Sequence, residues 1–257
     1  MSSNVDHARS SLVLPRYRVP TGVHPELMSP DYGSTRLRVP DRPLNKMPLT
    51  LTEVTGPLLG EGRVRESDAD MTRQHAGEPI GERIIVHGRV IEEGGRAVAN
   101  TLVEVWQANS AGRYAHASDE HPAPHDPNFT GVGRCLTDSN GRFRFTTVKP
   151  AAYPWLNHTN AWRPAHIHFS LFGRAFTQRL ITQMYFPGDP LFYQDPIMLA
   201  VRDEGARQRL IAEFDLAETV PEWALAYRFD IVLLGPDATP MEGLDNMEDP
   251  EHEEDDR

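Results

Sequence analysis

Two histidines with a single residue between them, His166 and His168, are the sharpest candidates for chemistry in this 257-residue chain. They stand in the run WRPAHIHF, residues 162–169. On a β-strand, side chains two residues apart point to the same face and are separated by about 6.7 Å along the chain. Two imidazoles so placed can bind one metal ion, but paired strand histidines also occur without a metal. The spacing alone leaves both interpretations open.

Any further metal ligands must come from elsewhere in the chain. A thiolate cluster is excluded because Cys135 is the single cysteine, and no acidic residue nearby has the spacing of a two-histidine, one-carboxylate site. Tyr114 and Tyr153 fall at strand ends or in loops, where sites are commonly built. Taken singly, each is more typical of a packing tyrosine with a satisfied hydroxyl. The residue pattern therefore suggests a site without defining it.

Short strands divided by turn signals must position these residues. We expect strands over residues 83–91, 101–107, 142–146, 165–171, 180–186 and 227–234. One short helix is expected to open near Asp203 and to carry on one stripe Leu210, Ile211 and Phe214. The pattern predicts an all-β fold, an antiparallel sandwich or barrel, of which we take the sandwich as the prediction. Parallel α/β architecture is disfavoured because the connections are too short.

Composition divides the chain into three regions. Residues 1–80 form a proline-rich, irregular arm that we expect to extend over a neighbouring surface, and residues 81–236 form the sandwich. Residues 237–257 form an acidic tail that we expect to be disordered. The net charge of −11 belongs mostly to this tail, because residues 242–257 hold nine of the 37 acidic side chains. The body is nearly neutral, which argues against a nucleic-acid partner.

No apolar run is long enough for a secretory signal or a membrane span. We therefore expect a cytoplasmic protein without a membrane partner.

Ten segments together resemble the intradiol ring-cleavage dioxygenases, over most of the chain from about residue 29 to 234. They are SPDY (29–32), GERIIV (81–86), NTLVE (100–104), WQAN (106–109), DPNF (126–129), GRCLTD (133–138), YPW (153–155), HIH (166–168), LITQ (180–183) and LAYRFDIVL (225–233). Within that family the chain is most similar to the iron-bearing beta chains of the enzymes that cleave protocatechuate (3,4-dihydroxybenzoate).

The resemblance implies one Fe(III) per chain, held by Tyr114, Tyr153, His166 and His168. Phenolate is a hard donor that suits a trivalent ion, and such an ion can lower the pKa of tyrosine far below about 10. The implied reaction is cleavage of protocatechuate with O2 to 3-carboxy-cis,cis-muconate, in aromatic-compound degradation through the beta-ketoadipate pathway. In the family, the tyrosine that matches Tyr153 leaves the metal when substrate binds and can take up a substrate proton.

The resemblance also implies roles around the metal: charge stabilisation by Arg163, polar contact by Gln183, apolar walls from Trp106, Trp155 and Ile197, and a contact to the substrate carboxylate from Tyr32. The last role would draw the arm into the active site and order it. Leu156 departs from the pattern, since related chains often carry arginine there. The segment 59–76 has no clear match.

A homologous alpha chain, lacking the iron ligands, is the implied partner in an (alpha-beta)n hetero-oligomer. The proline-rich arm favours this interpretation, because catechol and hydroxyquinol enzymes of the family usually begin with a helical dimerisation segment. A catechol or hydroxyquinol dioxygenase remains an alternative. A non-catalytic sandwich subunit is a further alternative, against which the presence of all four ligand-type residues argues.

Overall fold

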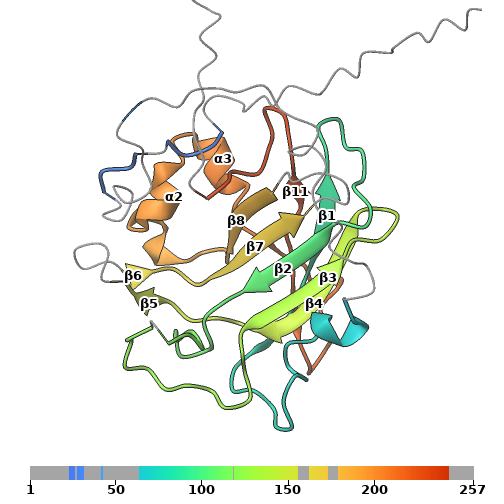
Figure 1. The fold of residues 1–257 in the computed structure, drawn as a ribbon, viewed down its shortest axis with the longest axis vertical. Coiled ribbons are helices and arrows are strands. Elements are labelled where there is room, and N and C mark those ends of the chain that lie inside the picture. The colour runs from blue at the N-terminus through green and yellow to red at the C-terminus, as the bar shows by residue number, and fades with distance from the viewer. Residues whose placement is uncertain are drawn as a thin grey trace, which may run out of the picture.

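The computed structural model describes residues 23–26, 28–31, 42, 64–117, 119–155, 162–172 and 179–242 (Figure 1). Tyr32, Leu156 and residues 243–257 lie outside the described residues, so the predictions that fall on them stay predictions. In chain order the elements, with η for a 3-10 helix, are η3 (Glu66–Ala69), β1 (Arg83–Ile91), β2 (Leu102–Trp106), β3 (Val132–Leu136), β4 (Arg142–Val148), β5 (Tyr153–Pro154), β6 (Trp162–Arg163), β7 (His166–Phe172), β8 (Arg179–Tyr185), η4 (Pro190–Tyr193), α2 (Pro196–Ala200), α3 (Glu204–Gln208), β9 (Glu213–Phe214), β10 (Leu225–Arg228) and β11 (Ile231–Val232).

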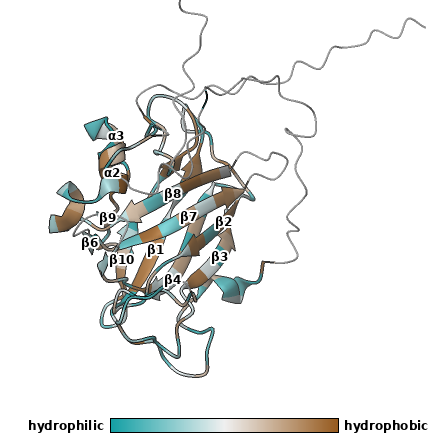
Figure 2. Cartoon of the chain, turned by 60° about the vertical axis from the view of Figure 1, so that its left-hand side comes forward, coloured by the Kyte–Doolittle hydropathy of each residue, from teal (hydrophilic) through white to brown (hydrophobic). Residues whose placement is uncertain are grey.

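The strands form two larger sheets and one small one. The first sheet has the order β11-β1-β10-β9, with β4 also paired to β1; the second has the order β3-β2-β7-β8, and β5 pairs with β6. Phe169 of β7 lies 5.9 Å, ring centroid to centroid, from Phe143 of β4 and 5.2 Å from Phe229. Figure 2 shows hydrophobic stretches on strands of both sheets, such as β1 and β2. The two sheets therefore enclose one core, and the predicted β-sandwich is confirmed.

Strand β7 shows how the alternation of side chains creates the site. Ile167, Phe169 and Leu171 point into the core between the sheets. His166 and His168 consequently point to the opposite face of the second sheet. That outer face is also covered, because His166 is 1% exposed and His168 is 9% exposed. The histidines thus occupy a buried position outside the main core.

The first sheet is mixed rather than purely antiparallel. β1 pairs antiparallel with β4, as predicted, but parallel with both β10 and β11. Ile84 pairs with Leu225 and Val90 with Ile231, an offset of 141 residues in both cases. The expected strand 227–234 is therefore divided into β10 and β11. Both pair with β1 in the same register, so no residue bulges out between them.

Gly88 accounts for the interruption between β10 and β11. The amide of Phe229 donates to the carbonyl of His87 at 2.8 Å, and a Cβ placed on Gly88 would lie 1.9 Å from the carbonyl oxygen of Phe229. Only glycine permits so close an approach of two backbones. The sequence pattern did not reveal this contact because it joins segments far apart in the chain.

The predicted helix begins where expected but ends early. Asp203 caps α3, since its Oδ1 accepts the amide of Ala206 at 2.6 Å. The predicted stripe through Leu210 to Phe214 is wrong, because the helix ends at Gln208 and Phe214 lies in β9. The carbonyl of Leu210 accepts the amide of Tyr185 at 2.8 Å, so this backbone pairs with the last residue of β8 instead of continuing the helix.

Helix α2 and strand β3 are two of the elements that were not predicted. The helix α2 opens with Asp195 as its cap and Pro196 at its first position, a recognisable start signal. Strand β3 contains Gly133, where a Cβ would lie 2.7 Å from Cγ of Met71. Met71 is fully buried and packs across β3 from the segment that precedes β1. Near the C-terminal end of the described residues, Ala238 and Met241 are also buried.

Among the described residues, none of the helices has both the length and the apolar character needed to cross a membrane.

Candidate active site and metal centre

Four predicted side chains meet at one point on the outer face of the second sheet. Nε2 of His166 lies 3.2 Å from Nε2 of His168, and the hydroxyl of Tyr114 lies 3.4 Å and 3.1 Å from these two nitrogens. The hydroxyl of Tyr153 lies 3.5 Å from Nε2 of His166. Ligands bonded to one metal ion at about 2.0–2.1 Å stand roughly 3 Å apart. The four donor atoms therefore have the spacing of a single metal centre.

The loop after β2 carries Tyr114 to this point. Oδ1 of Asn109 accepts the amides of Ala111 and Arg113, both at 2.9 Å, which folds the loop tightly. Gly112 has a positive φ of 80°, and a Cβ there would lie 2.5 Å from the carbonyl oxygen of Ala152. Glycine thus lets the loop of Tyr114 pass directly beside the loop that leads to Tyr153.

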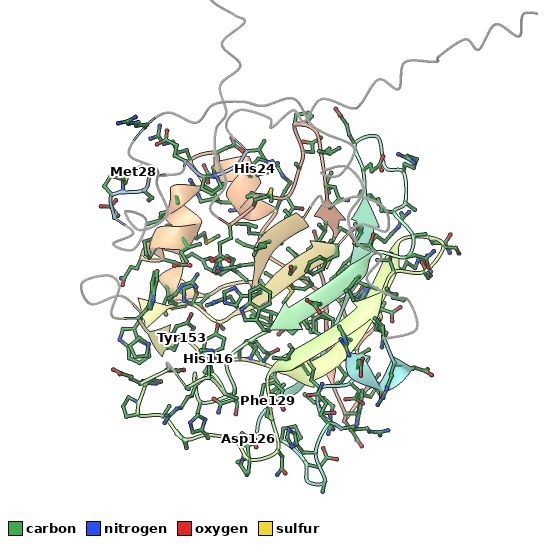
Figure 3. All side chains as sticks on the ribbon, viewed as in Figure 1. His24, Met28, His116, Asp126, Phe129 and Tyr153 are labelled. Carbon is green, nitrogen blue, oxygen red and sulfur yellow. The ribbon has the colours of Figure 1, made fainter. Side chains whose placement is uncertain are left out.

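Tyr153 and the histidines are held by separate devices. Tyr153 is labelled in Figure 3 and lies in β5, where it pairs with Arg163 of β6. Nδ1 of His166 lies 2.8 Å from the carbonyl oxygen of Pro164, so this nitrogen carries the proton and donates it. The lone pair of His166 is therefore on Nε2, which faces the other three donors.

The protonation of the cluster suits a metal cation. Burial, together with the positive charge of Arg163, holds the pKa of His166 well below its usual value. Burial also lowers the pKa of His168, although Glu242 opposes this. Both rings are therefore neutral near pH 7 and have a free lone pair. Burial and the neighbouring hydroxyl of Tyr153 raise the pKa of Tyr114 well above its usual value, which a bound trivalent cation would reverse.

Tyrosines are necessary to complete the donor set. Among the described residues, no group of three or more His, Cys, Asp and Glu side chains is placed to hold a metal ion. Two neutral imidazoles and two phenol oxygens form a mixed nitrogen and oxygen set, and phenolate favours a hard, highly charged ion. The residues present therefore fit Fe(III), and they do not resemble a thiolate-rich zinc site.

Arg163 lies beside this cluster in a buried network. Its Nε and Nη2 atoms donate to the two carboxylate oxygens of Asp195 at 3.1 Å and 2.9 Å. Nη2 also donates to Oε1 of Gln183 at 2.6 Å, and the hydroxyl of Tyr185 donates to Asp195 at 2.8 Å. The remaining nitrogen, Nη1, lies 3.0 Å from Nε2 of His166 and 3.4 Å from the hydroxyl of Tyr153. The network thus uses one side of the guanidinium for anchoring and leaves the other facing the site.

The predicted pocket residues differ in how closely they approach the donors. Trp106 stacks on His168, with ring centroids 4.7 Å apart and planes inclined by 3°. The ring centroid of Trp155 lies 5.6 Å from Cζ of Arg163. Ile197 is a half-buried residue of α2, two positions after Asp195. The roles of these three residues as walls of a pocket stay predictions.

Sequence reasoning missed the carboxylates of the site. Asp195 is 32 residues from Arg163, and Glu242 is 74 residues from His168, so neither contact has a local pattern. The helix-start signal at Asp195 was present in the sequence, but it points to a cap and not to an ion pair. Only the folded chain shows that the carboxylate of Asp195 both caps α2 and pairs with Arg163.

Two family models match the chain. The family model described as "Dioxygenase" matches residues 54–235, and the one described as "Protocatechuate 3,4-dioxygenase beta subunit N terminal" matches residues 17–50. The protocatechuate 3,4-dioxygenase beta chain of Burkholderia cepacia is 57% identical over 221 residues, covering 85% of this chain and 94% of that protein.

More distant relatives delimit the family. The protocatechuate 3,4-dioxygenase alpha chain of Pseudomonas putida is 28% identical over 77% of this chain and 97% of that protein. The crystal structure of 3-chlorocatechol 1,2-dioxygenase from Rhodococcus opacus superposes with a TM-score of 0.50 at 24% identity, covering 70% of each chain, which supports the fold alone. The chain therefore belongs to the intradiol dioxygenase family, within the protocatechuate 3,4-dioxygenase beta chains.

Proposed function

We propose that this chain is the catalytic beta subunit of a protocatechuate 3,4-dioxygenase, which cleaves protocatechuate with O2 to 3-carboxy-cis,cis-muconate. The observation that carries the proposal is the cluster of two buried histidines and two half-buried tyrosines, in a chain that is 57% identical to a protocatechuate 3,4-dioxygenase beta chain. Residues 81–236 would form the catalytic domain, with residues 1–80 as an arm and residues 237–257 as a tail.

Tyr114, Tyr153, His166 and His168 would hold one Fe(III), the metal that this family uses. Fe(III) held there would supply a Lewis acid for the catechol oxygens, which would make the aromatic ring reactive toward O2. A neutral ring with its lone pair on Nε2, as in His166, is ready to bind without first losing a proton. Burial of the two histidines keeps bulk water from competing for their nitrogens.

Tyr153 is suited to handle a substrate proton. Its hydroxyl lies at the edge of the cluster, within 3.4 Å of Nη1 of Arg163 and 3.5 Å of His166. This oxygen would be placed to accept a proton from a substrate hydroxyl.

Arg163 would stabilise negative charge that develops on the ring. Its guanidinium is 2% exposed and permanently charged, so its field acts in a medium of low dielectric constant. Gln183 supports its orientation through the 2.6 Å hydrogen bond to Nη2. Trp106, Trp155 and Ile197 would form the apolar walls against which the substrate ring lies.

A homologous alpha chain would complete the enzyme as an (alpha-beta)n hetero-oligomer. The similarity of this chain to both an alpha chain and a beta chain of known protocatechuate dioxygenases supports a common fold for the two subunits. Tyr32, in the arm, would contact the carboxylate of protocatechuate.

Oxygen uptake with protocatechuate, compared with catechol and hydroxyquinol, tests the proposal. We expect rapid uptake with protocatechuate, a burgundy protein, and 3-carboxy-cis,cis-muconate as the product. The variants His166→Ala and His168→Ala should lose both colour and activity. A colourless protein that stays colourless when iron is supplied, or a faster reaction with catechol, would refute the assignment.

A further inference from the structure

The two histidines of the proposed metal centre differ in the group that faces their Nδ1 atoms. Nδ1 of His166 donates to a backbone carbonyl, that of Pro164, at 2.8 Å. Nδ1 of His168 is buried and has no such hydrogen bond among the described residues. The charged oxygen that faces it is Oε2 of Glu242, at 3.5 Å. The orientation of His168 therefore depends on a group that the proposed reaction does not use.

Glu242 is fixed to the sheet by its own backbone and its neighbours. Its amide donates to the carbonyl of Ile181 in β8 at 2.7 Å. The hydroxyl of Thr182, also in β8, donates to the carbonyl of Pro240 at 2.7 Å. The segment that ends at Glu242 thus lies against β8, whose Gln183 pairs directly with His168. The backbone contact with β8 therefore places the carboxylate of Glu242 near His168, which lies in the neighbouring strand β7.

The N-terminal part of the chain reinforces this placement. Nδ1 of His24 accepts the amide of Met241 at 3.1 Å, over a separation of 217 residues. His24 is 5% exposed, and Figure 3 shows it near the α3 end of the molecule. The backbone on either side of Met241 is therefore held by two distant segments, which restricts where Glu242 can point.

The charge of Glu242 is also favourable. Arg163 and Asp195 neutralise each other in their own ion pair. Glu242 consequently adds a negative charge behind a ligand of a cation site. Trp106 stacks on the ring of His168 and fixes the plane of that ring, but stacking does not determine which ring nitrogen carries the proton.

We infer that Glu242 is a positioning residue for His168: its carboxylate, 3.5 Å from Nδ1, favours the tautomer with the proton on Nδ1 and so keeps the lone pair on Nε2 directed at the metal. The inference rests on the proposed iron centre. Carboxylates that hydrogen-bond a metal-bound histidine orient the ring and make it a stronger ligand, and losing one commonly weakens metal binding about 10- to 100-fold. His168 would then be a more strongly donating ligand than His166, which relies on a neutral carbonyl.

The test compares Glu242→Gln and Glu242→Ala with a control, Asp237→Asn, which removes an exposed carboxylate from the same segment. Each full-length chain is produced together with the alpha chain of its own organism. Iron affinity is measured by competition with a chelator, and the visible ferric–tyrosinate band is recorded. We expect iron affinity to fall about 10-fold or more in Glu242→Gln and further in Glu242→Ala, with a shifted band, and Asp237→Asn to match the wild type.

Melting curves of the iron-free proteins separate positioning from folding. Glu242→Gln keeps the size and an acceptor oxygen of the side chain, so its iron-free form should melt like the wild type. Wild-type iron affinity and an unshifted band in both Glu242 variants would overturn the inference alone. A wild-type chain that binds no iron would instead overturn the proposed function, and this inference with it.

Discussion

Replacing Asp195 by asparagine would test how the fold aims Arg163 at the site. The carboxylate of Asp195 is fully buried and binds the guanidinium through both oxygens, at 2.9 Å and 3.1 Å. Asparagine keeps the shape of the side chain but removes its charge and replaces one acceptor by an N–H donor. Arg163 then becomes a buried cation without its counter-charge.

The magnitude follows from the burial of the pair. The side chains of Arg163 and Asp195 are 3% and 0% exposed, so water does not screen or replace the lost charge. Removing one partner of such a pair costs about 3–5 kcal/mol of folding free energy. Because asparagine retains one acceptor, we expect the lower end, about 3 kcal/mol. For a chain of this size that corresponds to a fall of roughly 6–12 °C in Tm.

The effect on catalysis should be separate from the effect on stability. Deleting a preorganised electrostatic group lowers kcat about 100- to 1000-fold, which is the expectation for Arg163→Met. In Asp195→Asn the guanidinium remains but is less firmly aimed, so we expect a fall in kcat of about 10-fold with the iron content unchanged. The double variant Arg163→Met/Asp195→Asn should recover most of the Tm without recovering kcat, since no uncompensated cation remains.

The control is an ion pair of the same length on the surface. Nη1 of Arg144 lies 2.8 Å from Oε2 of Glu218, with both side chains about half exposed. Glu218→Gln should change the free energy of unfolding by less than about 1 kcal/mol. Differential scanning calorimetry and steady-state oxygen uptake measure both quantities. If Asp195→Asn melts and turns over like the wild type, the buried pair does not hold Arg163, and the reasoning fails.

Three further perturbations have defined outcomes. Tyr114→Phe should remove most of the visible colour and weaken iron retention, while the control Tyr193→Phe, at a residue that is 85% exposed, should change neither; full colour in Tyr114→Phe would contradict the ligand role. Gly88→Ala should lower Tm by several degrees, because the new Cβ would meet the carbonyl oxygen of Phe229 at 1.9 Å, and an unchanged melting curve would show that the two backbones can separate at no cost. Burial lowers the pKa of His24, so its contribution to stability is complete above its ordinary value of about 6.5 and is lost as the pH falls from there toward the lower folded-state pKa. Melting curves between pH 5 and 8 should therefore show a weaker pH dependence in His24→Gln, and identical slopes would exclude this effect.

Local patterns predicted the parts of the site that lie on one strand. The spacing of His166 and His168 was enough to place both rings on the same face of β7, and the structure confirms it. The same alternation placed Ile167 and Phe169 in the core. Such predictions succeed because successive side chains of a strand point to opposite faces of the sheet, so the face follows directly from the position in the strand.

Contacts between distant segments could not be predicted from spacing. Tyr114 joins the histidines only because the Asn109 loop and Gly112 turn it inward, and nothing near it in the sequence indicates the partner. The resemblance to the family supplied that link. Likewise, the parallel pairing of β1 was missed because short connections suggested neighbouring antiparallel strands.

The pairing of β1 with β10 and β11 has a consequence for how the chain folds. β1 is made early in synthesis, but its partners on one edge follow about 140 residues later. Until then that edge of β1 exposes unpaired backbone groups, which can pair with other chains. Contacts of such sequence separation also slow folding, because a long loop must close before they form. We therefore expect expression at lower temperature to raise the yield of correctly folded protein.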